Sequence, residues 1–267
     1  MKKAHRSLIL SLFALVLAIS VTAASTFAWF SMNTTVTAKG MSIKAKSDTP
    51  FLQIVNASTD FDNTQKQVEA SAVNATKDVR PTAVGTTTGE GATLAYVAYA
   101  KDTATANLKW VESFSNDPDA YQSEEAADRK FTDITTKANA TDTTNIYTLI
   151  NTFKVRLNPA TGATTANNFQ VSKVTIEKTN EGETANELDN AVRVLIVCGD
   201  KNVLYKYGAS EASLVITDQS KVLADTVTTD EKEVKVYVFF DGEDENCKTN
   251  NALEADSYAV TIEFKID

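Results

Sequence analysis

The histidine content of this sequence restricts the catalytic and metal-binding chemistry that the protein can use. The chain has 267 residues and one histidine, His5, which lies in an amino-terminal segment with the composition of an export signal. A Ser-His-Asp triad, a Cys-His pair and a zinc site with imidazole ligands each need a histidine in the folded domain. Because export would remove His5 with that segment, we expect none of these activities in the mature protein.

Carboxylates are the next candidates, and the densest group is the run from Asp241 to Asn246. Calcium takes about six to eight oxygen ligands, so Asp241, Glu243 and Glu245 are candidate calcium ligands. The run does not match an EF-hand loop, because its glycine is second and no glutamate follows at the twelfth position. A solvated turn after a strand explains the same residues, and both interpretations stay open.

Enzymatic use of the carboxylates has less support. Glycoside hydrolysis needs a carboxylate pair beside a sugar platform, and no Trp- or Tyr-rich cluster accompanies the acidic residues. The His-Glu-x-x-His pattern of metalloproteases is absent from the sequence. We therefore expect a protein that is not an enzyme and that has no cofactor other than the candidate calcium.

The two cysteines, Cys198 and Cys247, form a candidate disulfide. Outside the cell such a bridge would close a loop of roughly 50 residues and stabilise by about 3–4 kcal/mol in the chain-entropy model. Alternatively they are two unrelated thiols, with Cys198 a small apolar residue at the end of a strand. The sequence leaves both interpretations open.

The amino terminus has the three parts of a secretory signal: a basic tip, an apolar run from Leu8 to Val21, and small residues. Signal peptidase would cut at one of two sites. The first lies between Ala23 and Ala24, and the second lies between Ser25 and Thr26. Both frames satisfy the small-x-small rule, and the Ala/Ser/Thr-rich end of the segment favours cleavage. The expected location is extracellular or at the cell surface.

A retained membrane anchor is the alternative for this segment. No residue from Leu8 to Phe30 is charged, and roughly 23 helical residues at about 1.5 Å each would cross a hydrocarbon core of about 30 Å. Contact with a membrane is then expected only through this segment. The formal charge of −9 argues against nucleic-acid partners and against charge-driven binding of anionic lipid.

Composition and pattern predict an all-β fold. β-Branched residues are plentiful, while four prolines and nine glycines exclude a collagen-like or linker-like chain. Strands are predicted at 36–38, 41–45, 51–55, 94–99, 108–114, 149–157, 169–177, 192–198, 203–207, 214–216, 222–223, 234–240 and 258–266.

Local signals refine this prediction. The apolar phase shifts at Gly40, which indicates a β-bulge, and Gly199 begins a predicted hairpin turn. Asp117 and Pro118 start a short predicted helix that runs to Lys130. We expect an antiparallel β-sandwich with an N-terminal hydrophobic helix and one short surface helix. Residues 1–25 are the signal or anchor, and 26–267 form one domain with a polar insertion at about 57–145.

The run Ala24-Ser25-Thr26-Phe27-Ala28-Trp29-Phe30-Ser31, directly after the apolar segment, resembles the amino-terminal signature of TasA/camelysin-like secreted proteins of Gram-positive bacteria. Residues 191–197, 234–247 and 258–264 are similar to the closing strands of jelly-roll domains in clostridial relatives. The resemblance covers both ends of the chain and hardly reaches residues 57–145. It implies a jelly-roll β-sandwich and a secreted surface or matrix protein, and filament assembly is known for relatives. Because camelysin is described as a protease, the resemblance also implies a hydrolase alternative.

The leading functional hypothesis is a structural protein of extracellular fibres, a biofilm matrix or a cell-surface layer. Its copies would form a homopolymer in which the N-terminal strand of one enters the open sheet of the next, by donor-strand exchange. The expected assembly residues are Phe27, Trp29, Phe30, Val36, Ala38, Met41 and Ile43. The alternative is a membrane-anchored adhesin or carbohydrate-binding sandwich whose insertion supplies the binding loops; a secreted hydrolase comes third.

Overall fold

The fold is described from a computed structural model that covers residues 35–46, 52–65, 67–72, 77–88, 95–113, 131–140, 146–178, 187–208, 213–216, 218–247 and 257–267. Residues 34–267 form one compact unit. The predicted signal with Ala23, Ala24 and Ser25, the aromatic residues Phe27, Trp29 and Phe30, and the predicted helix at 117–130 lie outside the described residues. In the part of the chain described, no helix is long and apolar enough to span a membrane.

The structure is mostly β, as predicted, and the strands in the described ranges form three sheets. Sheet I contains, in order, β14 (Val222–Thr228), β10 (Thr165–Lys178), β16 (Ser257–Lys265), β1 (Thr35–Lys46) and β3 (Glu69–Ala72), and β4 (Lys77–Asp78) also pairs with β1. Sheet II contains β13 (Ser213–Leu214), β12 (Lys201–Lys206), β11 (Val192–Cys198), β15 (Lys232–Phe240), β9 (Leu149–Leu157) and β2 (Leu52–Asn56). Sheet III contains β6 (Ala95–Ala98), β5 (Thr82–Thr88), β7 (Lys109–Glu112) and β8 (Thr132–Asp133).

Sheets I and II pack against each other over the main apolar core. Alternate residues of β15, such as Val234 and Val236, meet Ile43, Val260 and Ile262 of sheet I in this core. Residues two apart on a strand share a face, so one face of sheet II packs against sheet I. This arrangement gives the predicted β-sandwich.

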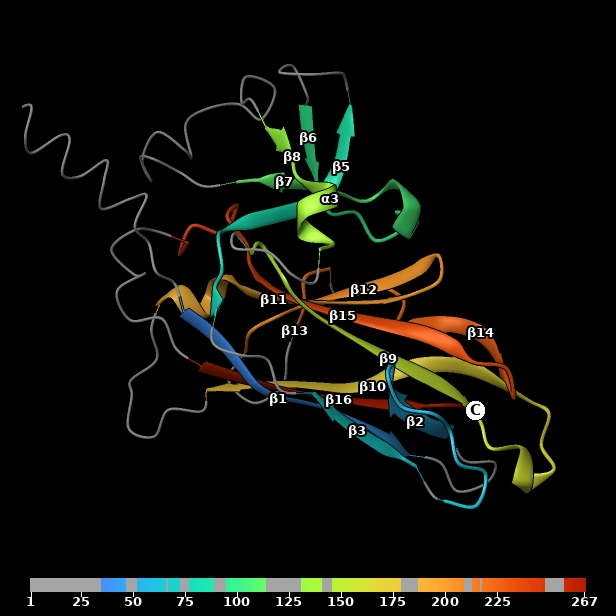
Figure 1. The fold of residues 1–267 in the computed structure, drawn as a ribbon. Coiled ribbons are helices and arrows are strands. Elements are labelled where there is room, and N and C mark those ends of the chain that lie inside the picture. The colour runs from blue at the N-terminus through green and yellow to red at the C-terminus, as the bar shows by residue number, and fades with distance from the viewer. Residues whose placement is uncertain are drawn as a thin grey trace, which may run out of the picture. The chain divides into compact units, whose positions relative to one another are not determined.

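Sheet III lies over the other face of sheet II, which the prediction of a two-layer sandwich did not include. Trp110 of β7 packs against Tyr237 and Phe239 of β15, with ring centroids 5.5 and 4.9 Å apart. The same cluster holds Leu195 and Val197 of β11. Figure 1 shows β9, β11 and β15 between the strands of sheet I on one side and β5 to β8 on the other.

The segment predicted as a polar insertion therefore contains regular structure. No strand was predicted between residues 56 and 93, but this part of the insertion includes β3, β4 and β5. β5 is rich in threonine, which favours strands without adding the hydrophobicity that the pattern analysis detects. A buried polar network fastens this segment to sheet II: the Tyr99 hydroxyl donates to the side-chain Oδ1 of Asn202 and accepts from the side-chain Nε2 of Gln219. Burial raises the pKa of Tyr99 to about 12, so the hydroxyl keeps its proton.

The pairing of β1 with β16 corrects the prediction of a wholly antiparallel fold, because these two strands run parallel. Their register shifts between Ala38 and Met41, which confirms the bulge predicted at Gly40. The predicted hairpin is also confirmed: β11 and β12 join through a two-residue turn in which Gly199 has φ 58°. A positive φ at the first turn position favours glycine.

Helical structure is minor in the described residues. The one α-helix there is α3 (Thr135–Ala138), which buries Ala138 in the cluster between sheets II and III. Three 3-10 turns accompany it, η2 (Thr105–Asn107), η3 (Pro159–Thr161) and η4 (Glu187–Ala191). These short elements connect strands and cover parts of the cores, so the fold depends on its sheets.

The turn after β15 joins the sandwich to sheet III through a close backbone approach. The Gly242 amide donates to the Thr82 carbonyl at 2.9 Å, and a Cβ at position 242 would lie 1.8 Å from the Ser113 carbonyl oxygen. Only glycine allows this approach without moving the end of β7.

Gly242→Ala should therefore destabilise the protein by about 2–3 kcal/mol, because the clash is with backbone rather than with a movable side chain. Gly199→Ala is the matched control: no atom lies within 4 Å of its Cβ, so only the positive φ opposes it, at a cost of about 1 kcal/mol. Urea unfolding of both variants measures the difference. An equal loss in the two variants would contradict the role of close approach at Gly242.

Candidate functional site

Strand β1 is the candidate assembly element, and it occupies an interior place in sheet I. It pairs with β16 on one side and with β3 and β4 on the other. Met41 and Ile43 are 0% exposed and belong to the main core. The first long strand of the described chain is therefore also a central strand of its sheet.

The register of β1 is fixed by polar contacts in addition to its buried apolar side chains. The hydroxyls of Ser42 and Thr261 lie 3.2 Å apart across the pair with β16. The Asn151 amide donates to the Met41 sulfur at 3.0 Å, and Lys44 pairs with Glu69 at 3.6 Å. A slip by one residue would turn Met41 and Ile43 out of the core and break these contacts.

The predicted assembly residues divide into three groups. Met41 and Ile43 are buried in the core of their own chain. Val36 and Ala38 lie in β1, where the backbone is described. Phe27, Trp29 and Phe30 lie outside the described residues. Residues 35–46 thus occupy an interior strand position of their own sheet. In donor-strand exchange, the same position would be occupied by the strand of another copy.

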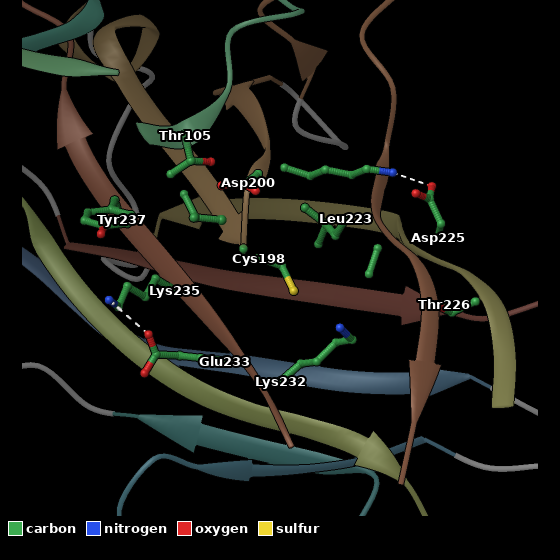
Figure 2. Close-up of a pocket in the computed structure, with 14 residues that line it drawn as sticks. Thr105, Cys198, Asp200, Leu223, Asp225, Thr226, Lys232, Glu233, Lys235 and Tyr237 are labelled. Atoms are coloured by element: carbon green, nitrogen blue, oxygen red, sulfur yellow. Dashed lines mark hydrogen bonds and ion pairs between the residues drawn. The ribbon is translucent and has the colours of Figure 1, made fainter. Parts of the chain in front are cut away.

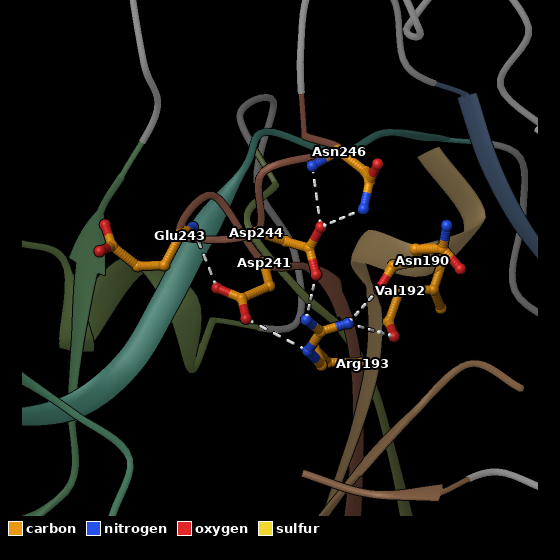
Figure 3. Close-up of polar contacts among 7 residues, drawn as sticks. All are labelled: Asn190, Val192, Arg193, Asp241, Glu243, Asp244 and Asn246. Atoms are coloured by element: carbon orange, nitrogen blue, oxygen red, sulfur yellow. Dashed lines mark hydrogen bonds and ion pairs between the residues drawn. The ribbon is translucent and has the colours of Figure 1, made fainter. Parts of the chain in front are cut away.

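Two of the predicted calcium ligands, Asp241 and Glu243, direct their carboxylates apart, Asp241 toward Arg193 and Glu243 away from it (Figure 3). The Asp241 carboxylate forms an ion pair with Arg193 Nε at 3.1 Å and accepts the Glu243 amide at 3.1 Å. The Glu243 side chain instead accepts a hydrogen bond from the Ser113 hydroxyl, and Glu245 is exposed. The described residues contain no group of three or more metal-ligating side chains. The arrangement of these three residues therefore adds no support to the calcium prediction, which stays a prediction.

Arg193 of β11 binds the acidic side chains of this turn, and it was not among the residues predicted from the sequence. Its side chain is 7% exposed and also pairs with Asp244, Nη2 to Oδ2, at 2.6 Å. Its Nη1 donates to the carbonyls of Asn190 and Val192, as Figure 3 shows. An arginine inside an apolar strand needs buried partners, so Val192-Arg193-Val194 was the available signal. The acidic residues of the turn neutralise this arginine and fasten the turn to β11.

Burial raises the pKa of Asp241 to about 6, although the neighbouring Arg193 and the hydrogen bond from the Glu243 backbone amide lower it. The desolvation of the carboxylate therefore outweighs its ion pair. In the folded chain Asp241 binds its proton more tightly than in the unfolded chain.

The two cysteines are free and buried, so the disulfide predicted between Cys198 and Cys247 is not formed. Cys198 ends β11, whereas Cys247 lies near the beginning of that strand, since its amide donates to Asp244, a partner of Arg193. The five steps along the strand from Arg193 to Cys198 cover about 16 Å, which exceeds the Cα separation of about 7 Å that a disulfide tolerates. Burial raises the pKa of both thiols.

Comparisons with known proteins give no relative for this chain. No protein-family model, no curated protein and no solved structure matches it. The function therefore has to be argued from the sequence and from the geometry of the described residues.

The raised pKa of Asp241 predicts a pH dependence of stability with a defined sign. As the pH falls from about 6 to about 4, Asp241 takes up a proton in the folded chain before it does so in the unfolded chain, so this group adds stability. The contribution of about 1–3 kcal/mol is lost as the pH rises through 6. Asp241→Asn should flatten this part of the profile in urea unfolding.

Asp218→Asn provides a control of opposite sign. A hydrogen bond from Lys101 lowers the pKa of Asp218, so this carboxylate loses stabilising effect as the pH falls. A wild-type profile that does not differ from that of Asp241→Asn between pH 4 and 7 would show that Asp241 titrates normally.

Proposed function

We propose that this protein is a secreted structural protein whose copies join by exchange of β1 and so build extracellular fibres of a biofilm matrix or a cell-surface layer. The observation that carries the proposal is the interior place of β1 in sheet I, between β16 and both β3 and β4. The amino-terminal resemblance to TasA/camelysin-like proteins supports export and a Gram-positive source, and the facing sheets I and II support a jelly-roll-like sandwich.

Exchange requires little new surface. A copy that receives β1 from a neighbour regains the core contacts of Met41 and Ile43 and the two ladders with β16 and β3. The exchanged state therefore has nearly the same bonds as the closed one, which is why swapping an identical element is a low-cost route to assembly.

The direction of exchange decides the product. If two copies trade β1 reciprocally, the contact closes and a dimer results. If each copy gives β1 to the next, the contact is head-to-tail and does not close, so a filament grows. A fibre-forming protein would use the second mode.

A cross-linking experiment tests the exchange directly. Ser42 of β1 and Thr261 of β16 are register partners with hydroxyls 3.2 Å apart, so cysteines at these positions are close enough to bond. Ser42→Cys and Thr261→Cys are prepared as separate proteins, mixed under assembly conditions and oxidised. We expect a covalent heterodimer on a non-reducing gel, together with filaments in negative-stain micrographs.

The control replaces Thr261→Cys by Thr175→Cys, which lies on β10, a strand that does not pair with β1. This mixture should give no heterodimer. If the first mixture also stays monomeric while Ser42→Cys and Thr261→Cys in one chain cross-link internally, exchange does not occur. The anchored monomeric binding module would then replace the fibre protein as the favoured hypothesis.

A further inference from the structure

The two outer strands of sheet I in the described part of the chain, β14 and β3, have different surroundings. Beside β14 lies a cavity of about 660 Å³ (Figure 2), in which Lys235 pairs with Glu233 and Lys201 pairs with Asp225. Because these charges pair with one another, they select no class of ligand. The other outer strand, β3, covers β1, which is the strand on which the proposed function depends.

Two ladders of unequal extent hold β1 in sheet I. β16 pairs with β1 over residues 37–46, whereas β3 pairs only with residues 41–44. Three side chains of β16 are 0% exposed and belong to the main core, Val260, Ile262 and Phe264. The ladder with β16 is therefore the longer one, and it belongs to the more deeply buried strand.

β3 adds little apolar surface to its side of β1. Its sequence is Glu-Ala-Ser-Ala, and Ala70, at 8% exposed, is its one buried side chain. An alanine buries a single methyl group, which stabilises much less than a buried isoleucine or phenylalanine. Lys44 and Glu69 pair across the two strands but are 51% and 63% exposed, and exposed ion pairs contribute little. β3 is therefore the weaker of the two partners of β1.

Two hydrogen bonds hold the β3 segment to β2 instead of β1. The Ile54 amide donates to the Gln67 carbonyl at 2.7 Å, and Asn56 Nδ2 donates to the Ser71 carbonyl at 2.9 Å. Asn56 Oδ1 is buried and has no hydrogen-bond partner among the described residues. A buried acceptor without a partner costs free energy, which water would return if β3 moved away. This unpaired acceptor lowers the cost of opening β3.

Movement of β3 would uncover one edge of β1 while the ladder with β16 stays intact. The contacts of β3 form again after exchange, because the strand received from another copy meets β3 of the receiving copy. They are thus the same in the closed and exchanged states, so a change in them does not shift the equilibrium between these states. A change in these contacts alters the rate of exchange.

We propose that residues 67–72 form a latch that sets the rate at which β1 exchanges between copies. The latch opens when β3 separates from β1 and β2, and β1 then leaves β16. It closes again on the strand of the next copy. This inference rests on the proposed function, because the latch has a role only if β1 exchanges.

Ala70→Gly weakens the latch without changing β1, since glycine loses the buried methyl group and orders less readily in a strand. The rate of exchange is measured as formation of the disulfide-linked heterodimer between Ser42→Cys and Thr261→Cys proteins, with Ala70→Gly in both. We expect this rate to rise about fivefold. The monomer concentration left at equilibrium, measured by sedimentation of the proteins without cysteines, should not change.

Ala166→Gly is the matched control. Ala166 is 6% exposed and lies on β10, which does not pair with β1. The same substitution there lowers global stability but leaves the latch intact, so the rate of exchange should equal that of the wild type. Equal acceleration by Ala70→Gly and Ala166→Gly would show that exchange requires global unfolding, and it would overturn the latch.

Reversal of the exposed ion pair tests whether the latch acts through its contact with β1. Glu69→Lys places two lysines opposite each other and should speed exchange about twofold. Lys44→Glu combined with Glu69→Lys restores an ion pair and should return the rate to that of the wild type. A rate that stays high in the double variant would contradict this contact.

Hydrogen exchange of the monomer separates failure of the latch from failure of the proposed function. Below the concentration of assembly, amides of residues 69–72 should exchange faster than those of 258–264, and Ala70→Gly should accelerate only the first group. If the heterodimer forms equally fast in the wild type and in Ala70→Gly, β1 exchanges but the latch is refuted. If the latch amides open as expected and no variant forms the heterodimer, exchange itself is refuted and the latch loses its role.

Discussion

The burial of sheet II on both faces is the constraint on which the rest of the structure depends. All seven residues of β11 are buried, so neither face of this strand can meet water. A strand of this kind reads as a continuous apolar run and needs a layer on each side. Sheet I covers one face, and sheet III with α3 covers the other. The segment between β2 and β9 is therefore part of the fold, because removing it would take away Trp110 and expose Tyr237 and Phe239 of β15.

Polar contacts connect the layers where apolar packing ends. Arg193 ties the turn after β15 to β11, and that turn reaches sheet III through Gly242 and Glu243. At the other end of β11, Asn202 donates to Thr103 and Thr105 at 3.1 Å. Buried groups of this kind are costly unless they are paired, so their pairing fixes how the layers meet.

The sequence predicted the elements whose pattern is local. Strands β9, β11 and β15 follow from β-branched and aromatic runs, and the Gly40 bulge follows from a phase shift. Features that depend on a residue far away in the sequence were not predicted. Nothing in the pattern of β1 indicates that it runs parallel to β16. Asp241 was only a candidate calcium ligand in the sequence, because its counter-ion, Arg193, lies on another strand. The candidate disulfide likewise depended on a distance that the sequence does not show, and the two cysteines are free.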